Sequence, residues 1–374
     1  MSPLSEIQAK PVIQHRKENT MLFTPLKVGA LDLSNRMVMA PLTRARSDLS
    51  HMPNDLMAEY YAQRASAGFI VTECTMIAPN TSAFVTEPGI YSQEQVQAWK
   101  KVTSAVHAKG GKIVMQIWHA GRAAHPLLNH GSENVAPSAI AISGEIQTLT
   151  GKVAHAVPRA LSTTEISAIV HTFASAARSA IEAGFDGVEV HGANGYLIDQ
   201  FLRDGANQRT DMYGGSLENR ARFLFEVLTE VCDAIGSERV GLRLSPLNSY
   251  NSMIDSDPTG LTAFLAERLN GYMLAYLHLM RTDFYQQQSA DILPVAREHY
   301  KGVLIGNMGY SSEEATAAIH DKKLDAVAFG TGFLANPDLP ARVQSGAALN
   351  VPDQSTFYTS GAKGYTDYPS MQSA

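Results

Sequence analysis

Eight short apolar segments alternate with longer amphipathic segments along this chain, and few folds accommodate such a pattern. The apolar segments are residues 35–41, 68–74, 112–119, 186–191, 240–245, 274–280, 303–307 and 325–330. Each is almost continuously apolar, as is typical of strands buried on both faces of a parallel sheet. Eight consecutive strand–helix units predict an α/β fold, the (β/α)8 TIM barrel. The alternative is a doubly wound open sheet, but no G-x-G-x-x-G motif follows any of these strands.

Two further segments complete the predicted barrel. Residues 27–35, KVGALDLSN, read as a short antiparallel hairpin ahead of the first strand, and we expect this hairpin to close the barrel floor. Residues 121–159 follow the third strand and are rich in Pro, Ser, Gly and His. A connection of this length in a compact domain is usually functional, so we expect a flap over the barrel mouth.

Composition limits the possible partners and the compartment. The net charge of the 374-residue chain is -6 and no basic run occurs, so nothing favours nucleic acid or an anionic membrane. No apolar run approaches the ~20 residues that span a bilayer. Residues 1–20 are polar and lack the apolar core of a signal peptide. We therefore expect a flexible tail over 1–20, a single domain over 21–371 and a cytoplasmic location. Two cysteines, Cys74 and Cys232, are too few for an iron–sulfur cluster or a cysteine zinc site, so no metal is predicted.

Polar and small side chains gather where the predicted strands end. In a barrel these carboxyl ends meet at one face, which carries the chemistry. From the first strand to the eighth, the residues at these ends are Pro41, Leu42, Thr43, Cys74, Gln116, Trp118, His191, Asn194, Tyr196, Arg243, Gly306, Asn307, Gly330 and Thr331.

The fourth strand leads into HGANGY, which places His191, Asn194 and Tyr196 on one turn. A histidine and an asparagine three residues apart can aim two hydrogen-bond donors at one oxygen. Tyr196 is a neutral acid at pH 7, because the reference pKa of tyrosine is about 10. Alone, the pattern is weak, since a histidine at a strand end is more often a structural hydrogen-bond partner.

Small residues after the seventh and eighth strands, followed by a short helix, are typical of a barrel phosphate site. Arg243 adds one cation, and Phe84, Trp118 and Tyr250 offer an apolar wall. Together these groups suit a flat phosphorylated cofactor such as FMN. Each residue also has a structural explanation. Arg243 could belong to a buried ion pair, Gln116 could satisfy hydrogen bonds in the barrel interior, and the glycines could simply form turns.

The segments NRMVMAPLTR, MQIWHAGR, EVHGANGYLIDQFL and NQRTDMYGGSLENRARF occur in this order, and over residues 21–371 the chain resembles the Old Yellow Enzyme family of FMN-dependent ene-reductases. HGANGY has the His/Asn form of the motif. The resemblance implies FMN contacts from Pro41, Leu42, Thr43, Cys74, Gln116, His191, Arg243, Gly306, Asn307, Gly330 and Thr331. It implies substrate contacts from Phe84, Trp118, His191, Asn194, Tyr250 and Tyr358.

The resemblance also implies a reaction. NADPH or NADH passes a hydride to flavin N5, and the same flavin then reduces the C=C bond of an α,β-unsaturated carbonyl or nitro compound. His191 and Asn194 hold the activating oxygen, and Tyr196 donates a proton to the α-carbon. Because both substrates use one site in turn, ping-pong kinetics are expected. The expected partners are the nicotinamide dinucleotide and small activated alkenes, with the protein a monomer or a homodimer.

Two positions depart from the family pattern. Thr331 stands where relatives usually carry an arginine that clamps the FMN phosphate, so our hypothesis is weaker FMN retention. Phe84 stands where relatives often carry a tyrosine, so the pocket wall lacks a hydroxyl at this position. Two other readings stay open at this point: a barrel acting on a phosphorylated metabolite without flavin, and a flavin-binding stress protein with incidental turnover.

Overall fold

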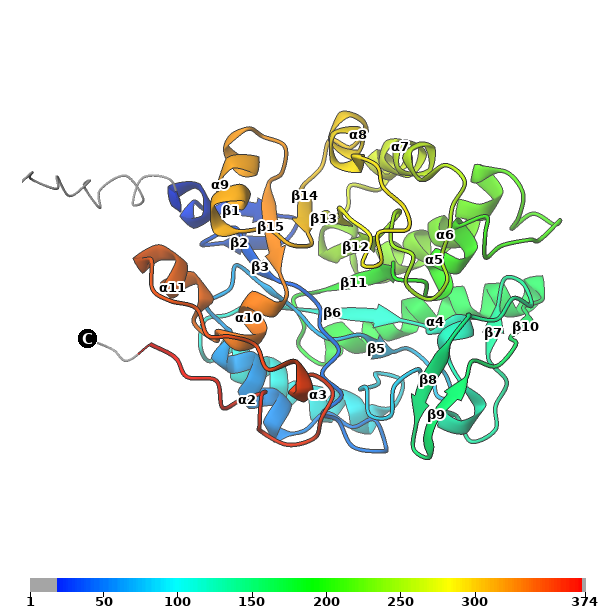
Figure 1. The fold of residues 1–374 in the computed structure, drawn as a ribbon, viewed down its shortest axis with the longest axis horizontal. Helices are drawn as coiled ribbons and strands as arrows, with labels where there is room; N and C mark the ends of the chain where they lie inside the picture. The colour runs from blue at the N-terminus through cyan, green and yellow to red at the C-terminus, as the bar shows by residue number, and fades with distance from the viewer. Residues whose placement is uncertain (1–18, 372–374) are drawn as a thin grey trace, which may run out of the picture.

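A closed barrel of eight parallel strands forms the centre of the computed structural model, which describes residues 19–371 (Figure 1). The strands are β3 (Met37–Met39), β4 (Ile70–Val71), β6 (Ile113–Trp118), β11 (Gly187–Gly192), β12 (Val240–Leu244), β13 (Tyr276–Met280), β14 (Leu304–Asn307) and β15 (Ala326–Phe329). The pairing of β15 with β3 and of β6 with β11 closes the ring. The predicted TIM barrel is therefore confirmed, with each strand inside its predicted segment or within one residue of it.

Helices surround the barrel and bury one face each against it. They are α2 (Asp55–Gln63), α3 (Gln93–His107), α4 (Thr163–Glu182), α6 (Leu217–Ile235), α7 (Pro258–Leu269), α8 (Ile292–His299), α9 (Ser312–His320) and α11 (Leu339–Ser345). In α4, a capping box of Ser162 and Glu165 satisfies the first turn, and Val170, Phe173 and Ala177 form a buried stripe at helical spacing. Two shorter helices, α5 (Leu197–Leu202) and α10 (Thr331–Ala335), follow the fourth and eighth barrel strands.

The predicted hairpin closes the barrel floor. Strands β1 (Leu26–Val28) and β2 (Leu31–Leu33) pair antiparallel. Val28, Leu31 and Leu33 belong to one buried cluster with Tyr276 and Ile305 from the barrel interior. Gly29 makes the close approach possible: its φ is +53°, and a Cβ there would lie 2.1 Å from a backbone oxygen.

The segment after β6 is long and has its own small strands. It contains β7 (Val135–Ala136), β8 (Glu145–Thr148) and β9 (Gly151–Ala154), and β10 (Arg159–Ala160) follows directly. Strands β8 and β9 form a hairpin that projects at the lower right of Figure 1. Arg122 ties the segment to the loop after β12, donating to the carbonyl of Asn251 across 2.9 Å. The predicted excursion is present, but the residues that line the cavity described below come from other loops.

The chain ends add two observations. Residues 1–18, most of the predicted tail, lie outside the described residues, and Asn19 and Thr20 already belong to the short helix η1 (Asn19–Phe23). Across residues 19–371, no helix combines the length and the apolar character needed to cross a bilayer.

Candidate active site

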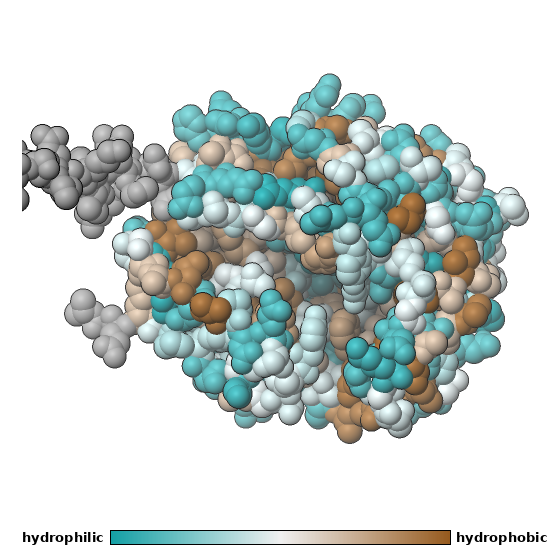
Figure 2. Space-filling model, viewed as in Figure 1, coloured by the Kyte–Doolittle hydropathy of each residue, from teal (hydrophilic) through white to brown (hydrophobic). Residues whose placement is uncertain are grey.

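A cavity of about 950 Å³ opens at the carboxyl ends of the barrel strands. Figure 2 shows the molecule hollowed near the middle of this face. The volume lies in the range of about 300–1,000 Å³ typical of cofactor and substrate sites. Fifteen of the predicted site residues line the cavity: Pro41, Leu42, Thr43, Cys74, Phe84, Gln116, His191, Asn194, Tyr196, Arg243, Tyr250, Asn307, Gly330, Thr331 and Tyr358. Arg44, which was not predicted, also lines it.

Two of the predicted site residues, Gly306 and Trp118, do not line the cavity. A Cβ at Gly306 would lie 2.4 Å from a methyl carbon of Leu324, so the glycine lets this leucine pack closely against β14. Trp118 is fully buried, and its ring meets that of Tyr196 edge-on with centroids 4.3 Å apart. The tryptophan therefore supports Tyr196 from behind.

The turn after β11 is held so that the Asn194 side chain reaches the cavity. Asn194 and Gly195 both have positive φ, 57° and 70°. The N–H of Asn194 donates to Ser245 Oγ across 2.8 Å, and the N–H of Gly195 donates to Asp199 Oδ2 across 2.8 Å. Asn248, which the sequence did not single out, donates to Asn194 Oδ1 across 2.8 Å. The Asn194 NH2 group is therefore left as a donor towards the cavity.

At neutral pH the side chains of His191 and Tyr196 are both uncharged, and each carries a proton that it can donate in a hydrogen bond. Burial lowers the pKa of His191 well below its usual value, and the nearby Arg243 adds to this effect, so the imidazole is neutral. Its buried Nδ1 has no partner among the described residues. Burial raises the pKa of Tyr196 well above 10, so the phenol is protonated. Their ring centroids lie 5.2 Å apart.

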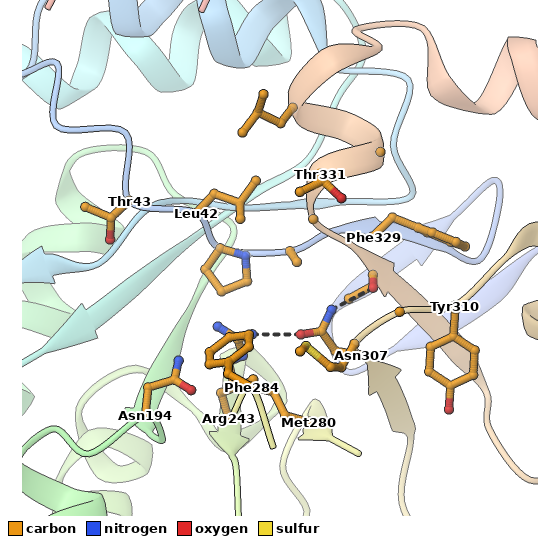
Figure 3. Close-up of a pocket in the computed structure, with 18 of the residues that line it drawn as sticks. Leu42, Thr43, Asn194, Arg243, Met280, Phe284, Asn307, Tyr310, Phe329 and Thr331 are labelled. Atoms are coloured by element: carbon orange, nitrogen blue, oxygen red, sulfur yellow. Dashed lines mark hydrogen bonds between the residues drawn. The ribbon is translucent and has the colours of Figure 1, made fainter. Parts of the chain in front are cut away.

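Arg243 is fixed beneath the centre of the cavity. Its guanidinium donates to Asn307 Oδ1 across 2.8 Å, and Asn307 Nδ2 donates to the carbonyl of Ala328 across 2.8 Å (Figure 3). The Asn307 amide thus bridges β12 and β15, and Asn307 also lines the cavity. The buried Nε of Arg243 has no partner among residues 19–371, which suits an electron-rich ligand.

Gln116 is anchored from below by a buried carboxylate–histidine pair. Its Nε2 donates to Glu189 Oε1 across 2.8 Å, and Glu189 Oε2 lies 2.9 Å from His278 Nδ1. Both members of the pair are fully buried. Burial alone would raise the pKa of Glu189, but His278 and then Arg243 more than offset this, so the pKa lies below its usual value. No sequence pattern connects these three residues, which lie far apart in the chain.

Thr43 also lines the cavity, and its Oγ1 lies 3.1 Å from Cys74 Sγ. Burial raises the pKa of the Cys74 thiol well above its usual value, so the sulfur keeps its proton. An S–H that donates to Thr43 leaves the threonine hydroxyl proton free for a ligand.

Aromatic rings form the outer wall. Phe84 stacks with Tyr358 at 6.2 Å between centroids, and Tyr250 stacks with Tyr285 at 6.4 Å. Tyr358 belongs to the C-terminal segment 356–366, which two buried arginines clamp through its carbonyl groups. Arg46 donates to Thr356 O across 2.8 Å, and Arg44 donates to Gly364 O across 2.7 Å.

The far end of the cavity was only partly predicted. Thr331 and Tyr310 lie at this end, away from Thr43 and Asn194 (Figure 3). Besides Gly330 and Thr331, its lining includes residues 308–313, MGYSSE, which join β14 to α9. The positive φ of Met308, 93°, is unusual for a side chain of this kind and was not readable from sequence.

The cavity fits FMN. Buried, unpartnered nitrogens on Arg243 and His191, the donors at Thr43 and Asn194, and a small-residue loop at the far end match a flat ring with a phosphate tail.

Comparisons with known proteins agree. A family model for the NADH:flavin oxidoreductase / NADH oxidase family matches residues 21–350. The chain is 52% identical to a probable flavin mononucleotide-dependent alkene reductase of Leishmania infantum, covering 95% of this chain and 99% of that protein. Its structure matches the old yellow enzyme from Trypanosoma cruzi with a TM-score of 0.92 and 43% identity, over 94% of this chain and 99% of that one.

Morphinone reductase in complex with tetrahydroNAD is also similar, with a TM-score of 0.89 and 46% identity over 94% of this chain and 98% of that one. The sequence resemblance is thus confirmed over nearly the whole chain. The protein belongs to the NADH:flavin oxidoreductase / NADH oxidase family and shares its fold with the Old Yellow Enzymes.

Proposed function

We propose that this protein is an FMN-dependent ene-reductase that uses NADPH or NADH to reduce the C=C bond of α,β-unsaturated carbonyl or nitro compounds. Family membership supports the class of reaction. One observation supports this reaction in the present chain. His191, Asn194 and Tyr196 form a cluster of three hydrogen-bond donors on one wall of the cavity. We further propose that residues 21–371 act as one FMN-binding domain.

In the proposed reaction, His191 and Asn194 bind the carbonyl or nitro oxygen. The neutral imidazole and the Asn194 NH2 group donate to this oxygen and stabilise the negative charge that develops on it. Since His191 is buried and Asn194 is held by the hydrogen bonds of its turn, these donors need little reorganisation when the charge appears.

Tyr196 supplies the proton to the α-carbon. Its raised pKa keeps the phenol protonated over the neutral range, and Trp118 holds the ring from behind. Phe84, Tyr250 and Tyr358 offer an apolar wall against which the substrate can pack.

For the cofactor, we propose that Thr43, Gln116 and Arg243 hold the flavin ring, while Gly330, Thr331 and the 308–310 loop surround its phosphate. Pro41, Leu42 and Cys74 line the ring. FMN held in this way would supply the hydride chemistry, with the nicotinamide as its reductant. Arg243 offers the positive charge that favours an anionic reduced ring.

A spectroscopic experiment tests this function. The purified protein should show the absorbance bands of bound flavin, lose them anaerobically with NADPH or NADH, and regain them on addition of 2-cyclohexenone or a nitroalkene. A colourless protein would favour a phosphorylated-metabolite enzyme without flavin. A reduced flavin that no activated alkene re-oxidises would favour a flavin-binding protein without this activity.

A further inference from the structure

The far end of the cavity has an unusual charge distribution for a site that binds a phosphate. Within residues 19–371, the cationic residues lining the cavity are Arg44 and Arg243. Arg44 bonds the C-terminal segment and Arg243 bonds Asn307, so each has a different partner. Thr331 carries no charge. A dianionic phosphate at this end would meet no lining guanidinium.

A cation lies directly behind this end instead. Arg281 follows β13 and does not line the cavity, but its Nε donates to Met308 O across 2.8 Å and its Nη2 to Gly309 O across 3.2 Å. Its guanidinium lies 3.7 Å from the centroid of the Tyr310 ring and forms a two-pronged ion pair with Glu314. The arginine is therefore held from three sides against the outside of the loop.

These contacts orient the peptide groups of the loop. In a trans peptide the C=O and N–H point in opposite directions. When the carbonyls of Met308 and Gly309 face Arg281, the N–H groups of Gly309 and Tyr310 face the other way. Both residues line the cavity, and neither N–H donates to another described residue. Arg281 also stabilises the positive φ of Met308, which is costly for a side chain without such support.

We propose that Arg281 is the positioning residue of the phosphate end: from outside the cavity it turns two peptide N–H groups towards the cofactor phosphate. This inference rests on the proposed function, because it assumes that the phosphate of FMN lies at this end. It predicts a specific dependence: Arg281 strengthens the binding of FMN but not that of riboflavin, which has the same ring and no phosphate.

The test compares FMN and riboflavin binding to full-length apoprotein by quenching of flavin fluorescence. We expect Arg281→Gln to raise the Kd of FMN about tenfold, the effect of losing one charge-assisted interaction, and to leave the Kd of riboflavin unchanged. Arg281→Lys keeps the charge but cannot hold two carbonyls at once, so its Kd for FMN should stay closer to that of the Gln variant than to that of wild type.

Arg297 offers a matched control. It pairs with Asp325 across 3.0 Å and donates to Gly302 O across 3.1 Å, and its side chain is 26% exposed against 22% for Arg281. It lies before β14, whereas Arg281 contacts the loop after β14. Arg297→Gln should change neither Kd, and the thermal midpoint of each apoprotein reports any general loss of stability.

The outcomes separate this inference from the proposed function. If wild-type apoprotein binds neither flavin, the proposed function fails. If wild type binds FMN and Arg281→Gln binds it equally well, or if both flavins weaken together, only the role of Arg281 is refuted. Full recovery by Arg281→Lys would refute positioning and leave charge alone as the cause.

Discussion

The side-chain amide of Asn248 donates to Asn194 Oδ1 across 2.8 Å, and it can do so in only one orientation. Asn248 Oδ1 accepts from the N–H of Phe284 across 3.2 Å and from that of Tyr250 across 3.4 Å, so its oxygen cannot turn towards Asn194. The relay fixes which end of Asn194 faces the cavity. A donor for the substrate oxygen is thus specified by backbone atoms two loops away.

We therefore expect Asn248→Ala to slow re-oxidation of the reduced enzyme by 2-cyclohexenone by about 10–100-fold, since a misdirected donor loses much of an oxyanion contact. Stopped-flow absorbance gives the rate. Asn194→Ala should cost at least as much, and the double variant little more, because both act through one amide. If the rate losses of the two single variants multiply in the double variant, the two residues act independently and Asn248 does not orient Asn194. Asn219→Ala, at a half-buried position in the first turn of α6 that does not line the cavity, is the control.

Tyr196→Phe should slow alkene-dependent re-oxidation by about 10²–10⁴-fold, since it removes the proposed general acid. Reduction of the flavin by the nicotinamide needs no proton from this phenol and should change little. Stopped-flow separation of the two half-reactions measures both. In wild type, Tyr196 should cause no loss of rate up to pH 9, because its pKa lies well above 10. Equal losses in both half-reactions would argue against the role.

Asp199 should make wild-type stability depend on pH. Burial raises its pKa to about 6 in the folded protein, against an unfolded value near 3.9. The folded state then binds the proton more tightly, so stability is greatest below pH 4 with respect to this group and falls as pH rises to 6. Asp199→Asn should lack this fall of roughly 2–3 kcal/mol. Urea unfolding at pH 4, 5, 6 and 7 measures the free energy of unfolding of both proteins. If this free energy changes with pH in the same way in wild type and variant, Asp199 is not the group that titrates.

Arg46→Met should loosen the C-terminal segment and with it Tyr358. Arg46 donates to the carbonyls of Thr356 and Phe357, each across 2.8 Å, and methionine keeps the bulk without the donors. We expect faster cleavage within 356–366 in limited proteolysis and a KM for alkenes raised about threefold to tenfold, the effect of about one lost contact. Arg159→Met, at an exposed ion pair, controls for the lost charge. An unchanged KM would disprove the link to Tyr358.

Thr331→Arg should strengthen FMN binding, because an arginine at the end of β15 would add a charged fork towards the phosphate. An increase of about tenfold in affinity is expected from one such interaction. Titration of FMN into wild-type and variant apoprotein measures it, with Thr331→Gln as the uncharged control. If the arginine variant binds no better, the threonine does not limit FMN retention.

Much of the architecture could be predicted because the barrel strands are buried on both faces and so are apolar throughout. The same logic placed Thr43, Gln116, Arg243 and the HGANGY turn at one end of the barrel. The strand pattern could not show which of two residues on the same face of a strand reaches the cavity. Gln116 and Trp118 share a face of β6, but Tyr196 lies in front of the tryptophan.

Other site residues were missed because they act through partners remote in sequence. Asn248 meets Asn194, Glu189 meets His278, and Arg281 meets the 308–309 carbonyls only once the barrel is closed. Glu189 and His278 lie inside apolar strand patterns, where a single polar residue gives no hint of its partner. Asn307 was found, but its bridge from Arg243 to Ala328 could not be seen without the neighbouring strand.

The closure of β15 onto β3 has a consequence for biosynthesis. Leu42 and Thr43 leave the ribosome early, whereas Thr331 and Tyr358 emerge near the end, and all four line one cavity. No partial chain holds both walls of the site. Cofactor capture must then follow synthesis of nearly the whole polypeptide, so a chain truncated before residue 330 would carry no flavin even where its first seven barrel strands had formed.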